Sequence, residues 1–555
     1  MRWCKILLIA SFISGLDSKC FQPNIIKLPD GKIRGHTLKS AKGKTFYAYQ
    51  EIPYAAPPIG NRRFAEPEEP EPWKGILNAT KNTKVCMQTK PSPGGIETTE
   101  DCLYLNVYTP LKSTGKKLDL LPVVVYVHGG VFLFEAGGIQ YYDPKYLMDY
   151  DIVAVMINYR LGALGFLATY DGTIPGNLGL KDTLMALRWV NKNIAKFGGD
   201  KTRVTLMGSS SGAMSLSYLQ QSKLATDLAR GYILDCGTSF STISYQNDPD
   251  HYAFKLARML DKNFTSNSTR DLLEFLRRRP AEDLLYSPIY SDTYNVTISL
   301  GFVWLPSIED SSYEKALITK PMVESYMKGD FQKAPILIGT ANKEIINITP
   351  EPTVFFSEVK RYDSSYKELI NPYLNVSEED REQAGKEYKL IYTDGKFEDD
   401  IDAFMSFVSE DELSTPIIHY ATLVSEHAPA YFWQFSYRGL MGGGYQTIPY
   451  AGHAENLFYL FAGVYAFNGD PAIYPKEDQL NMARVLKIWT NFIKYQNPTP
   501  EPDELLNGII WPKFSSDRSE YVDIDRNLTI RRNPKNYKKV KAVFDKYARP
   551  PYYIY

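Results

Sequence analysis

The chain has 555 residues, and its 63 Lys and Arg are balanced by 64 Asp and Glu, which leaves a formal net charge of −1. This balance offers no excess of positive charge to a phosphate backbone, so the composition disfavours nucleic-acid binding. Apolar residues make up 44% of the chain and charged residues 23%, which is typical of a globular protein with a large core and excludes disorder as its main state.

The first residues have the pattern of a secretory signal peptide. A short positively charged start is followed by an apolar run at 6–13 and then by small residues. The run is too short to cross a bilayer, and no later stretch reaches about eighteen uninterrupted apolar residues. We therefore expect a cleaved leader at residues 1–18, a single domain over 19–555, and a secreted product without a membrane span.

Signals for N-glycosylation agree with secretion. The pattern Asn-x-Ser/Thr occurs at Asn78, Asn263, Asn267, Asn295, Asn347, Asn375 and Asn527. Because this modification takes place in the secretory pathway, the set supports export of the chain without identifying which asparagines are used.

Five cysteines occur, and Cys4 belongs to the expected leader. Cys86 and Cys102 enclose a short segment that contains proline and glycine. In an oxidising compartment we expect these two to form a disulfide, which would stabilise the fold by about 3 kcal/mol on a loop-entropy model. Cys20 and Cys236 either pair with each other or remain free.

Short, nearly continuous apolar runs recur along the chain, at 122–127, 152–157, 204–207, 336–338 and 431–435. Such runs are typical of strands that are buried on both faces of a parallel sheet. Between the second and third runs, apolar residues spaced three and four apart predict a helix over 180–197 that ends at Gly198 and Gly199. Strand, helix and strand in this order predict a right-handed parallel crossover.

Two charge-rich stretches with helical spacing, at 263–285 and 376–427, predict further helices outside the sheet or inserted over it. Together with the apolar runs they indicate the α/β class. We expect a central, mostly parallel sheet with helices on both faces and with helical insertions.

The most informative local pattern is Gly-Ser-Ser-Ser-Gly at 208–212, which follows the run at 204–207 and precedes a stretch suited to a helix. A serine between two glycines at a tight strand-to-helix turn has its hydroxyl group exposed. The glycines let the neighbouring backbones approach closely, and the start of the helix favours developing negative charge. Ser210 is therefore the candidate nucleophile.

A serine hydroxyl needs a base, and the order serine, acid, histidine removes the two histidines that precede Ser210. His419 lies in an apolar helical pattern, where a structural role fits better. His453 lies among small residues in a loop, where an imidazole can project freely. His453 is thus the preferred base, with His427 and His251 in reserve.

The acid and the oxyanion donors are expected at the ends of strands. Glu344 lies on a loop beyond the run at 336–338, where open α/β sheets place active groups, although a solvated loop charge is an alternative interpretation. Gly129 and Gly130 directly follow another run, so their amides can face a ligand closely. With the amide of Ser211 they are the candidate oxyanion donors.

Taken in this order, these residues resemble the type-B carboxylesterase and cholinesterase family of α/β-hydrolases, and in particular its secreted insect-type members. The resemblance covers nearly the whole mature chain, with EIPYAAPPIG at 51–60, EDCLYLNVY at 100–108, NYRLG at 158–162, GNLGLKD at 176–182 and FGGD at 197–200. It implies the α/β-hydrolase fold and places Ser210, Glu344 and His453 at the positions of the family's catalytic triad. It also places Cys86 and Cys102 at the family's first disulfide.

Four positions depart from the family pattern. The family usually has Glu-Ser-Ala in the serine turn, whereas Ser209 and Ser211 stand here. Ser211 contributes a backbone amide and should still serve, but the loss of the glutamate is expected to change the rate and the pH profile. Ile345 replaces a glycine and is expected to tilt Glu344, and Cys236 stands where serine is common.

The resemblance implies a secreted carboxylic ester hydrolase that works through an acyl-enzyme without metal or cofactor. Its partners would be small, uncharged and fairly apolar esters, such as lipid-derived signals, odorants, hormone esters or foreign esters. Choline esters are not expected, because the disulfide loop lacks the tryptophan with which cholinesterases hold a quaternary ammonium. The alternatives are a catalytically impaired relative used for binding or adhesion, and a lipase acting at lipid surfaces. The oligomeric state is left open.

Overall fold

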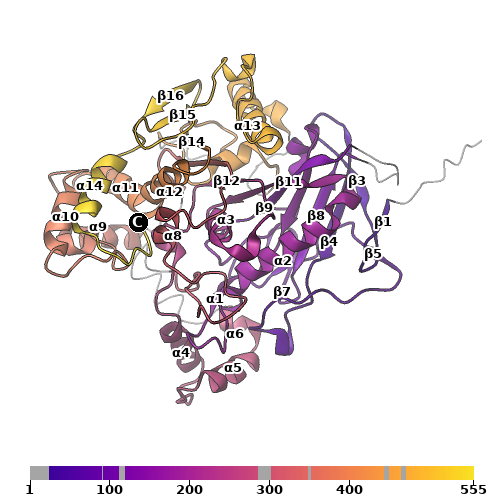
Figure 1. Cartoon of the computed structure of the whole chain (residues 1–555), viewed down its shortest axis with the longest axis horizontal. Coiled ribbons are helices and arrows are strands. Elements are labelled where there is room, and N and C mark those ends of the chain that lie inside the picture. Colours follow the sequence, from indigo (N-terminus) through magenta and orange to yellow (C-terminus); the bar gives the residue numbers. More distant parts are fainter. Residues whose placement is uncertain are drawn as a thin grey trace, which may run out of the picture.

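An eleven-stranded sheet forms the centre of the molecule (Figure 1). Our computed structural model describes residues 24–90, 92–111, 119–285, 302–347, 352–442, 449–463 and 470–555, so the expected leader and Cys20 lie outside the described residues. The strands follow the order β16 (Leu528–Arg532), β15 (Glu520–Ile524), β14 (Ala430–Phe435), β13 (Ile336–Ala341), β12 (Gly231–Asp235), β11 (Gly199–Ser209), β9 (Leu121–Val127), β10 (Val153–Ile157), β8 (Tyr104–Thr109), β4 (Thr45–Pro53) and β3 (His36–Lys39).

The middle of this sheet is parallel and its two margins are antiparallel. From β10 to β15 every neighbouring pair is parallel, whereas β8, β4, β3 and β16 join antiparallel. The prediction of a mostly parallel sheet is confirmed, and its five apolar runs lie in β9, β10, β11, β13 and β14. Two small sheets lie beside it, one of β1 (Ile25–Lys27), β2 (Lys32–Arg34) and β5 (Ile76–Asn78), the other of β6 (Lys84–Cys86) and β7 (Glu97–Thr99).

The helices connect the strands or extend from the sheet in insertions. They are α1 (Gly162–Phe166), α2 (Leu178–Asn193), α3 (Ser211–Gln221), α4 (Pro249–Leu260), α5 (Thr269–Arg277), α6 (Ala281–Leu285), α8 (Met322–Met327), α9 (Pro352–Ser364), α10 (Arg381–Lys389), α11 (Ile401–Ser409), the π-helix η9 (Glu410–Ser414), α12 (Thr415–Ser425), α13 (Lys476–Tyr495) and α14 (Tyr537–Tyr547). Short 3₁₀ turns include η4 (Ile194–Phe197), η7 (Glu344–Asn347) and η10 (Glu455–Tyr459). Within the described ranges, none of the helices has the combination of length and apolar character that crossing a bilayer requires.

Both faces of the sheet are buried, which explains why its strands read as continuous apolar runs. Along β9, Val123, Val125 and Val127 belong to one apolar cluster, and Val124 and Tyr126 belong to another. The first cluster contains residues of α2, α3 and α12, and the second contains residues of α13. The helices predicted on both faces are therefore present.

The predicted helix after β10 is also present, as α2 followed by η4, and it ends at Gly198 with a φ of 82°. A positive φ at this position is the usual glycine ending of a helix. The stretch at 263–285 contains α5 and α6, and the stretch at 376–427 contains α10, α11, η9 and α12. Both are helical, with breaks that the sequence did not indicate.

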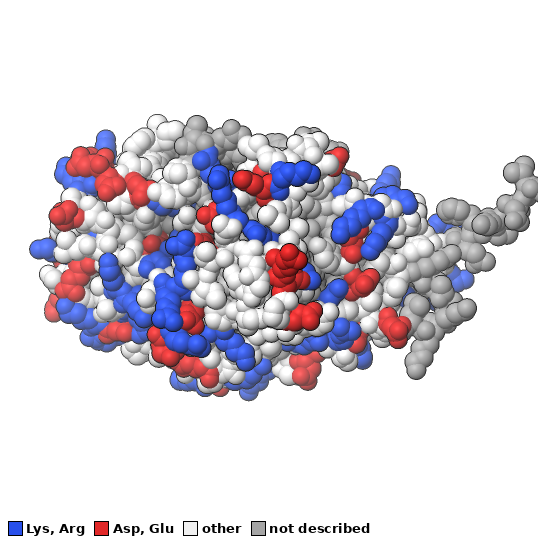
Figure 2. All heavy atoms as spheres, turned by 90° about the horizontal axis from the view of Figure 1, so that it is seen from above, with Lys and Arg blue, Asp and Glu red and all other residues white. Residues whose placement is uncertain are grey.

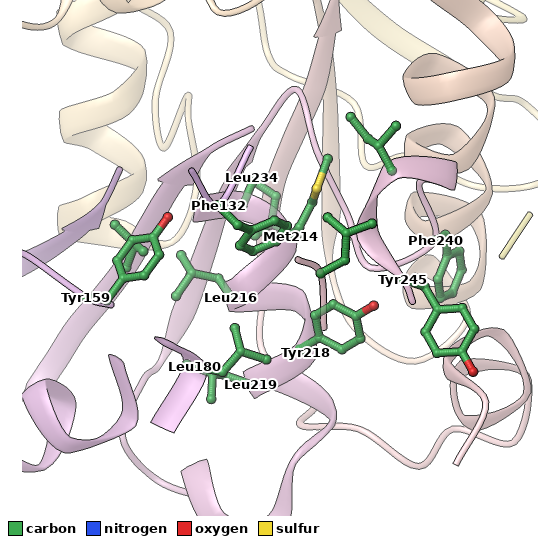
Figure 3. Packing of buried hydrophobic residues seen from close by; sticks show 14 of the residues in the cluster. Phe132, Tyr159, Leu180, Met214, Leu216, Tyr218, Leu219, Leu234, Phe240 and Tyr245 are labelled. Carbon is green, nitrogen blue, oxygen red and sulfur yellow. The ribbon is translucent and has the colours of Figure 1, made fainter. Parts of the chain in front are cut away.

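Helix α3 starts directly after the serine turn and is buried along almost its whole length. Figure 3 shows Met214, Leu216 and Leu219 of this helix packed among apolar neighbours that include Leu180 and Leu234. Burial of each such side chain stabilises the fold by about 1.5–3 kcal/mol. This packing fixes the position of the turn that precedes the helix.

The surface carries both charge signs side by side. In the view of Figure 2, lysine and arginine lie interspersed with aspartate and glutamate over most of the face shown. This agrees with the balanced composition of the chain.

Candidate active site

The candidate residues meet at the carboxyl edge of the parallel strands. Gly129 and Gly130 follow β9, Ser210 follows β11, and Glu344 follows β13. Paired residues at this edge, such as Gly208 of β11 with Val127 of β9, bring the strand ends level with one another. A parallel sheet delivers its loops to one edge, which is where ligands bind in folds of this kind.

Ser210 occupies the strained turn that its sequence context predicts. Its φ is 54° and its ψ is −127°, an unusual conformation for a residue other than glycine. Both flanking glycines are required by close packing: a Cβ on Gly212 would lie 2.1 Å from the Val127 carbonyl oxygen, and one on Gly208 would lie 2.5 Å from the carbonyl carbon of Gly212. Ser210 remains 7% exposed.

Glu344 and His453 are hydrogen-bonded to each other. His453 Nδ1 lies 2.6 Å from Glu344 Oε2. The other carboxylate oxygen, Oε1, accepts hydrogen bonds from Thr340 Oγ1 and from the Ala341 amide, each at 2.6 Å. Because an ionised carboxylate can only accept, the neutral imidazole carries its proton on Nδ1 and leaves Nε2 as an acceptor.

The loops that carry this pair are also joined through their backbones. The His453 amide donates to the Glu344 carbonyl oxygen at 3.2 Å, and the Lys343 amide donates to the Ala451 carbonyl oxygen at 3.0 Å. The acid loop and the histidine loop thus form one bonded unit. Their relative position does not depend on the two side chains alone.

The electrostatic environment favours an ionised acid beside a basic imidazole. Burial opposes the charge on Glu344, but the hydrogen bonds from His453, Thr340 and Ala341 outweigh it and hold the pKa of Glu344 below its ordinary value. Burial likewise opposes an imidazolium at His453, but the hydrogen bond and charge of Glu344 outweigh it and raise the pKa of His453. The pair is therefore suited to accept a proton at His453.

Contacts around the serine turn join Ser210 to the segment 235–237, which adjoins this pair. The Ser210 amide donates to the Asp235 carbonyl oxygen at 2.8 Å, and a Cβ on Gly237 would lie 2.4 Å from the Ser210 carbonyl oxygen. Between these two neighbours, the Cys236 sulfur lies within 4.8 Å of the ligand atoms of the acid–histidine pair. The serine, the imidazole and the carboxylate thus surround the same short segment after β12.

The glycines after β9 lie against the serine turn. A Cβ on Gly129 would lie 3.0 Å from the Ser210 Cβ, so the backbone of Gly129 adjoins the candidate nucleophile. Gly130 has a φ of 90°, and a Cβ there would lie 2.1 Å from the Phe134 carbonyl oxygen. Val131 also has a positive φ, of 48°, which is strained for a β-branched residue. Such strain is often found in functional loops.

His419 lies apart from this pair. It stacks on Tyr555, and its Nδ1 lies 2.8 Å from the Tyr537 hydroxyl. Burial lowers the pKa of His419 to about 3, which suits a neutral structural histidine.

Ile345, one of the positions that depart from the family pattern, packs in the core next to the acid. Ile345 is buried, and its amide donates to Ser409 Oγ at 3.1 Å. With Ile345 beside it, Glu344 still keeps its hydrogen bond to His453. The backbone of the acid loop is held from outside, so the bulkier side chain is accommodated in the core.

The cysteines divide into one disulfide and one free thiol among the described residues. The predicted Cys86–Cys102 disulfide is confirmed. Cys236 is a free, fully buried thiol. Burial and the charges of Glu344 and Asp235 raise the pKa of Cys236 well above its ordinary value, so it stays protonated at neutral pH.

Five of the candidate glycosylation sites are exposed, at Asn78, Asn263, Asn267, Asn375 and Asn527. Asn295 and the side chain of Asn347 lie outside the described part of the chain.

Sequence reasoning missed a second buried carboxyl group next to the site. Asp235 is fully buried at the end of β12, and its Oδ2 accepts a hydrogen bond from Asn456 Nδ2 at 2.6 Å. Burial raises the pKa of Asp235 to about 6, with a further contribution from the charge of Glu344. The signal that would have found it is an aspartate ending the short apolar stretch Tyr-Ile-Leu just before Cys236.

A mostly parallel sheet, a serine at a strained strand-to-helix turn, and an acid and a histidine on later loops define an α/β-hydrolase. The model of the carboxylesterase family matches residues 22–542, and the chain belongs to this family. It is therefore a carboxylic ester hydrolase.

Individual proteins of this family are similar over most of their length. Esterase FE4 of Myzus persicae is 31% identical over 532 residues, which cover 90% of each chain. Juvenile hormone esterase of Tribolium castaneum is 29% identical over 543 residues, which cover 93% of this chain and 90% of the relative. The crystal structure of juvenile hormone esterase from Manduca sexta, with OTFP covalently attached, matches with a TM-score of 0.82 and 27% identity, covering 94% of this chain and 99% of that one.

Proposed function

We propose that this protein is a secreted serine carboxylesterase that hydrolyses uncharged, fairly apolar esters through an acyl-enzyme. Ser210 is the nucleophile, His453 the general base and acid, and Glu344 the group that orients and stabilises the imidazole. The amides of Gly129, Gly130 and Ser211 would bind the oxyanion. The hydrogen bond of 2.6 Å between Glu344 and His453, beside a serine in a strained turn, is the observation that carries this proposal.

In the first half of the reaction, Ser210 Oγ bonds to the ester carbonyl carbon while its proton passes to His453 Nε2. The carbonyl oxygen becomes an oxyanion, which the backbone amides stabilise. When this intermediate collapses, the bond to the alcohol oxygen breaks and His453 returns the proton to that oxygen. The products of this half are the free alcohol and an acyl group on Ser210.

In the second half, water takes the place of the serine. His453 Nε2 accepts a proton from the water as its oxygen bonds to the acyl carbon. The second oxyanion collapses, the bond to Ser210 Oγ breaks, and His453 gives the proton back to the serine. Glu344 remains ionised throughout and balances the charge of the imidazolium in both halves.

The test of the nucleophile compares substitutions of two serines, Ser210 just before α3 and Ser215 within it. Ser210→Ala should lower kcat for p-nitrophenyl butyrate by at least about 10³-fold and should prevent labelling by an organophosphate. Ser215→Ala is the matched control, because Ser215 is buried and its hydroxyl donates to the Ser211 carbonyl oxygen within α3. A Ser210→Ala protein that keeps its activity would overturn the proposed mechanism.

Two of the similar proteins are named as esterases of a juvenile hormone, which supports an apolar ester as the substrate. The absence of a tryptophan between Cys86 and Cys102 supports the same class against choline esters. A direct comparison uses butyrylcholine and its uncharged isostere 3,3-dimethylbutyl butyrate, which differ in one positive charge. The neutral ester should have the higher kcat/KM, and a preference for the choline ester would contradict the proposed class.

Secretion has its own test. Full-length protein expressed in insect cells should appear in the medium, begin near residue 19, and lose mass on treatment with an N-glycosidase. Retention inside the cell with an intact amino terminus would contradict this part of the proposal.

A further inference from the structure

Two hydroxyl groups form a hydrogen-bonded chain behind Glu344. Thr340, the last but one residue of β13, places its Oγ1 2.6 Å from Glu344 Oε1. The same Oγ1 lies 2.7 Å from the hydroxyl of Ser414, the last residue of η9. All three side chains are fully buried. The chain runs from the π-helix through the strand to the carboxylate that holds His453.

The direction of the hydrogen bonds follows from the number of protons. Thr340 has a single hydroxyl proton, and the ionised carboxylate beside it can only accept. The proton of Thr340 is therefore directed at Glu344, and Ser414 must donate its own proton to Thr340. Consecutive hydroxyls that donate in one direction polarise and strengthen one another, above all in a buried setting.

The helix that supplies Ser414 also holds the acid loop at a second point. Ser409, the last residue of α11, accepts the hydrogen bond from the Ile345 amide. The helix continues from α11 through η9 into α12, and Pro416 lies at its next turn. A proline inside a continuing helix removes one backbone donor and crowds the preceding turn, and the wider π-turn η9 lies just before Pro416.

We propose that Thr340 and Ser414 are positioning residues for the esterase reaction, whose hydroxyls fix Glu344 Oε1 so that Oε2 remains aimed at His453. This inference rests on the proposed function, because it gives Glu344 a catalytic task. Neither residue touches the substrate or the reacting atoms in this mechanism. Their effect would pass through the acid alone.

Removal of the Thr340 donor changes the apparent pKa of the acid–histidine pair in a direction that can be worked out. With one hydrogen bond fewer, the carboxylate attracts a proton more strongly, so the apparent pKa of the acid–histidine pair rises. The acid limb of the kcat/KM profile should then move to higher pH.

Other charged and titratable groups face this pair from the elements around it. They are Asp235 at the end of β12, Cys236 directly after it, Glu135 in the loop after β9, and Lys535 just before α14, which in turn faces Glu410 at the start of η9. The proposed substitutions leave all of these groups in place. A shift of the acid limb therefore reports the loss of the hydroxyl itself.

The experiment uses the full-length enzyme and counts active sites with an organophosphate. Thr340→Val should lower kcat about 10-fold, leave KM within about twofold, and move the acid limb up by about half a pH unit. Thr340→Ser keeps a hydroxyl at this position, so it should keep the wild-type kcat and the wild-type position of the acid limb of the kcat/KM profile. Thr490→Val is the matched control, because Thr490 is buried and its hydroxyl donates to the Leu486 carbonyl oxygen of its own helix.

Ser414 is tested by a double-mutant cycle. Ser414→Ala alone should lower kcat about threefold, because Thr340 keeps its bond to the acid but loses the polarising donor. Added to Thr340→Val, the same substitution should cost almost nothing, since the chain is already broken. Equal costs in both backgrounds would overturn the idea of a continuous chain.

The outcomes separate this inference from the proposed function. If Ser210→Ala and His453→Ala are inactive while Thr340→Val has the wild-type kcat and pH profile, the triad stands and the positioning role is refuted. If His453→Ala keeps full activity, the proposed function itself fails. A loss in Thr340→Val that appears only as fewer active sites, with unchanged kcat per site, would show a structural role and would refute the inference.

Discussion

Replacement of Glu344 by glutamine changes one carboxylate oxygen to an NH2 group and leaves the shape of the side chain almost unchanged. The structure decides which oxygen is lost. The Ala341 amide lies 2.6 Å from Oε1 and can only donate, so the amide oxygen of the new glutamine must face it. The NH2 group is then turned toward His453 Nδ1, where Oε2 stood.

This arrangement forces the wrong tautomer of His453. An NH2 group and an Nδ1–H group at a separation of 2.6 Å would repel each other, so the imidazole moves its proton to Nε2. Nε2 can then no longer accept the proton of Ser210. The corresponding carboxylate-to-amide change in a serine protease triad costs about 10⁴ in kcat, or about 5.5 kcal/mol, and we expect Glu344→Gln to lose about 10³- to 10⁴-fold.

The assay measures kcat for p-nitrophenyl butyrate per active site, with circular dichroism to verify the fold. Glu358→Gln is the control, since Glu358 is also a buried carboxylate but pairs with Arg361 on α9, at 3.0 Å. This control should keep its kcat. A Glu344→Gln enzyme within about tenfold of the wild type would refute the reasoning, because it would show that neither the charge nor the tautomer of His453 matters.

The same substitution has a consequence for stability whose sign follows from the pKa shift. The folded state lowers the pKa of Glu344 below its ordinary value of 4.5, so its carboxylate stabilises the fold at neutral pH. This stabilisation declines as the pH falls below 4.5 and is lost as the pH falls through the lowered pKa of the folded state. The difference in Tm between wild type and Glu344→Gln should therefore narrow in acid. A Tm difference that widens in acid would contradict the lowered pKa of Glu344.

Three other outcomes follow from the geometry. Gly130→Ala should abolish activity and lower the free energy of unfolding by about 2–4 kcal/mol, because the Cβ of the new alanine would lie 2.1 Å from the Phe134 carbonyl oxygen. A variant with the wild-type kcat would show that the loop tolerates a side chain. Cys236 should resist iodoacetamide in the native enzyme and react after unfolding in urea, since it is buried with a raised pKa; rapid native alkylation would contradict this. The acid limb of kcat/KM should have its midpoint above 6.5, because Glu344 raises the pKa of His453, and a midpoint below 6.5 would disagree.

Five strands of the parallel part, β9, β10, β11, β13 and β14, could be predicted because burial on both faces leaves a plain signal in the sequence, whereas β12 and β15 were missed. Strand β9 is apolar at nearly every position, since its alternate residues enter two different clusters. Strand β8 was missed because buried polar residues interrupt its pattern. Asn106 is one of them: its Oδ1 accepts from the Glu51 amide and its Nδ2 donates to the Gly137 carbonyl oxygen. Only the folded neighbours make an asparagine acceptable there.

The candidate site could be predicted only in part, for a similar reason. Ser210 was proposed from local order alone, because the glycines and the strand-to-helix turn lie within a few residues of it. Glu344 and His453 are 109 residues apart, and the bond between them depends on the topology of the sheet. The choice of Glu344 relied mainly on the family resemblance, since a glutamate on a loop is common on any protein surface.

The contribution of Ser414 lies beyond pattern reading because it depends on a local change of helix type. On a regular α-helix with 3.6 residues per turn, residues five apart point in directions that differ by about 140°. Ser409 and Ser414 would then face different sides, and at most one of them could reach the acid loop. In the π-turn η9 the hydrogen bond joins residues five apart, so such residues lie nearly above each other. Both serines contact the segment around Glu344 for this reason, and Pro416 is the one local sequence signal that the helix departs from α geometry.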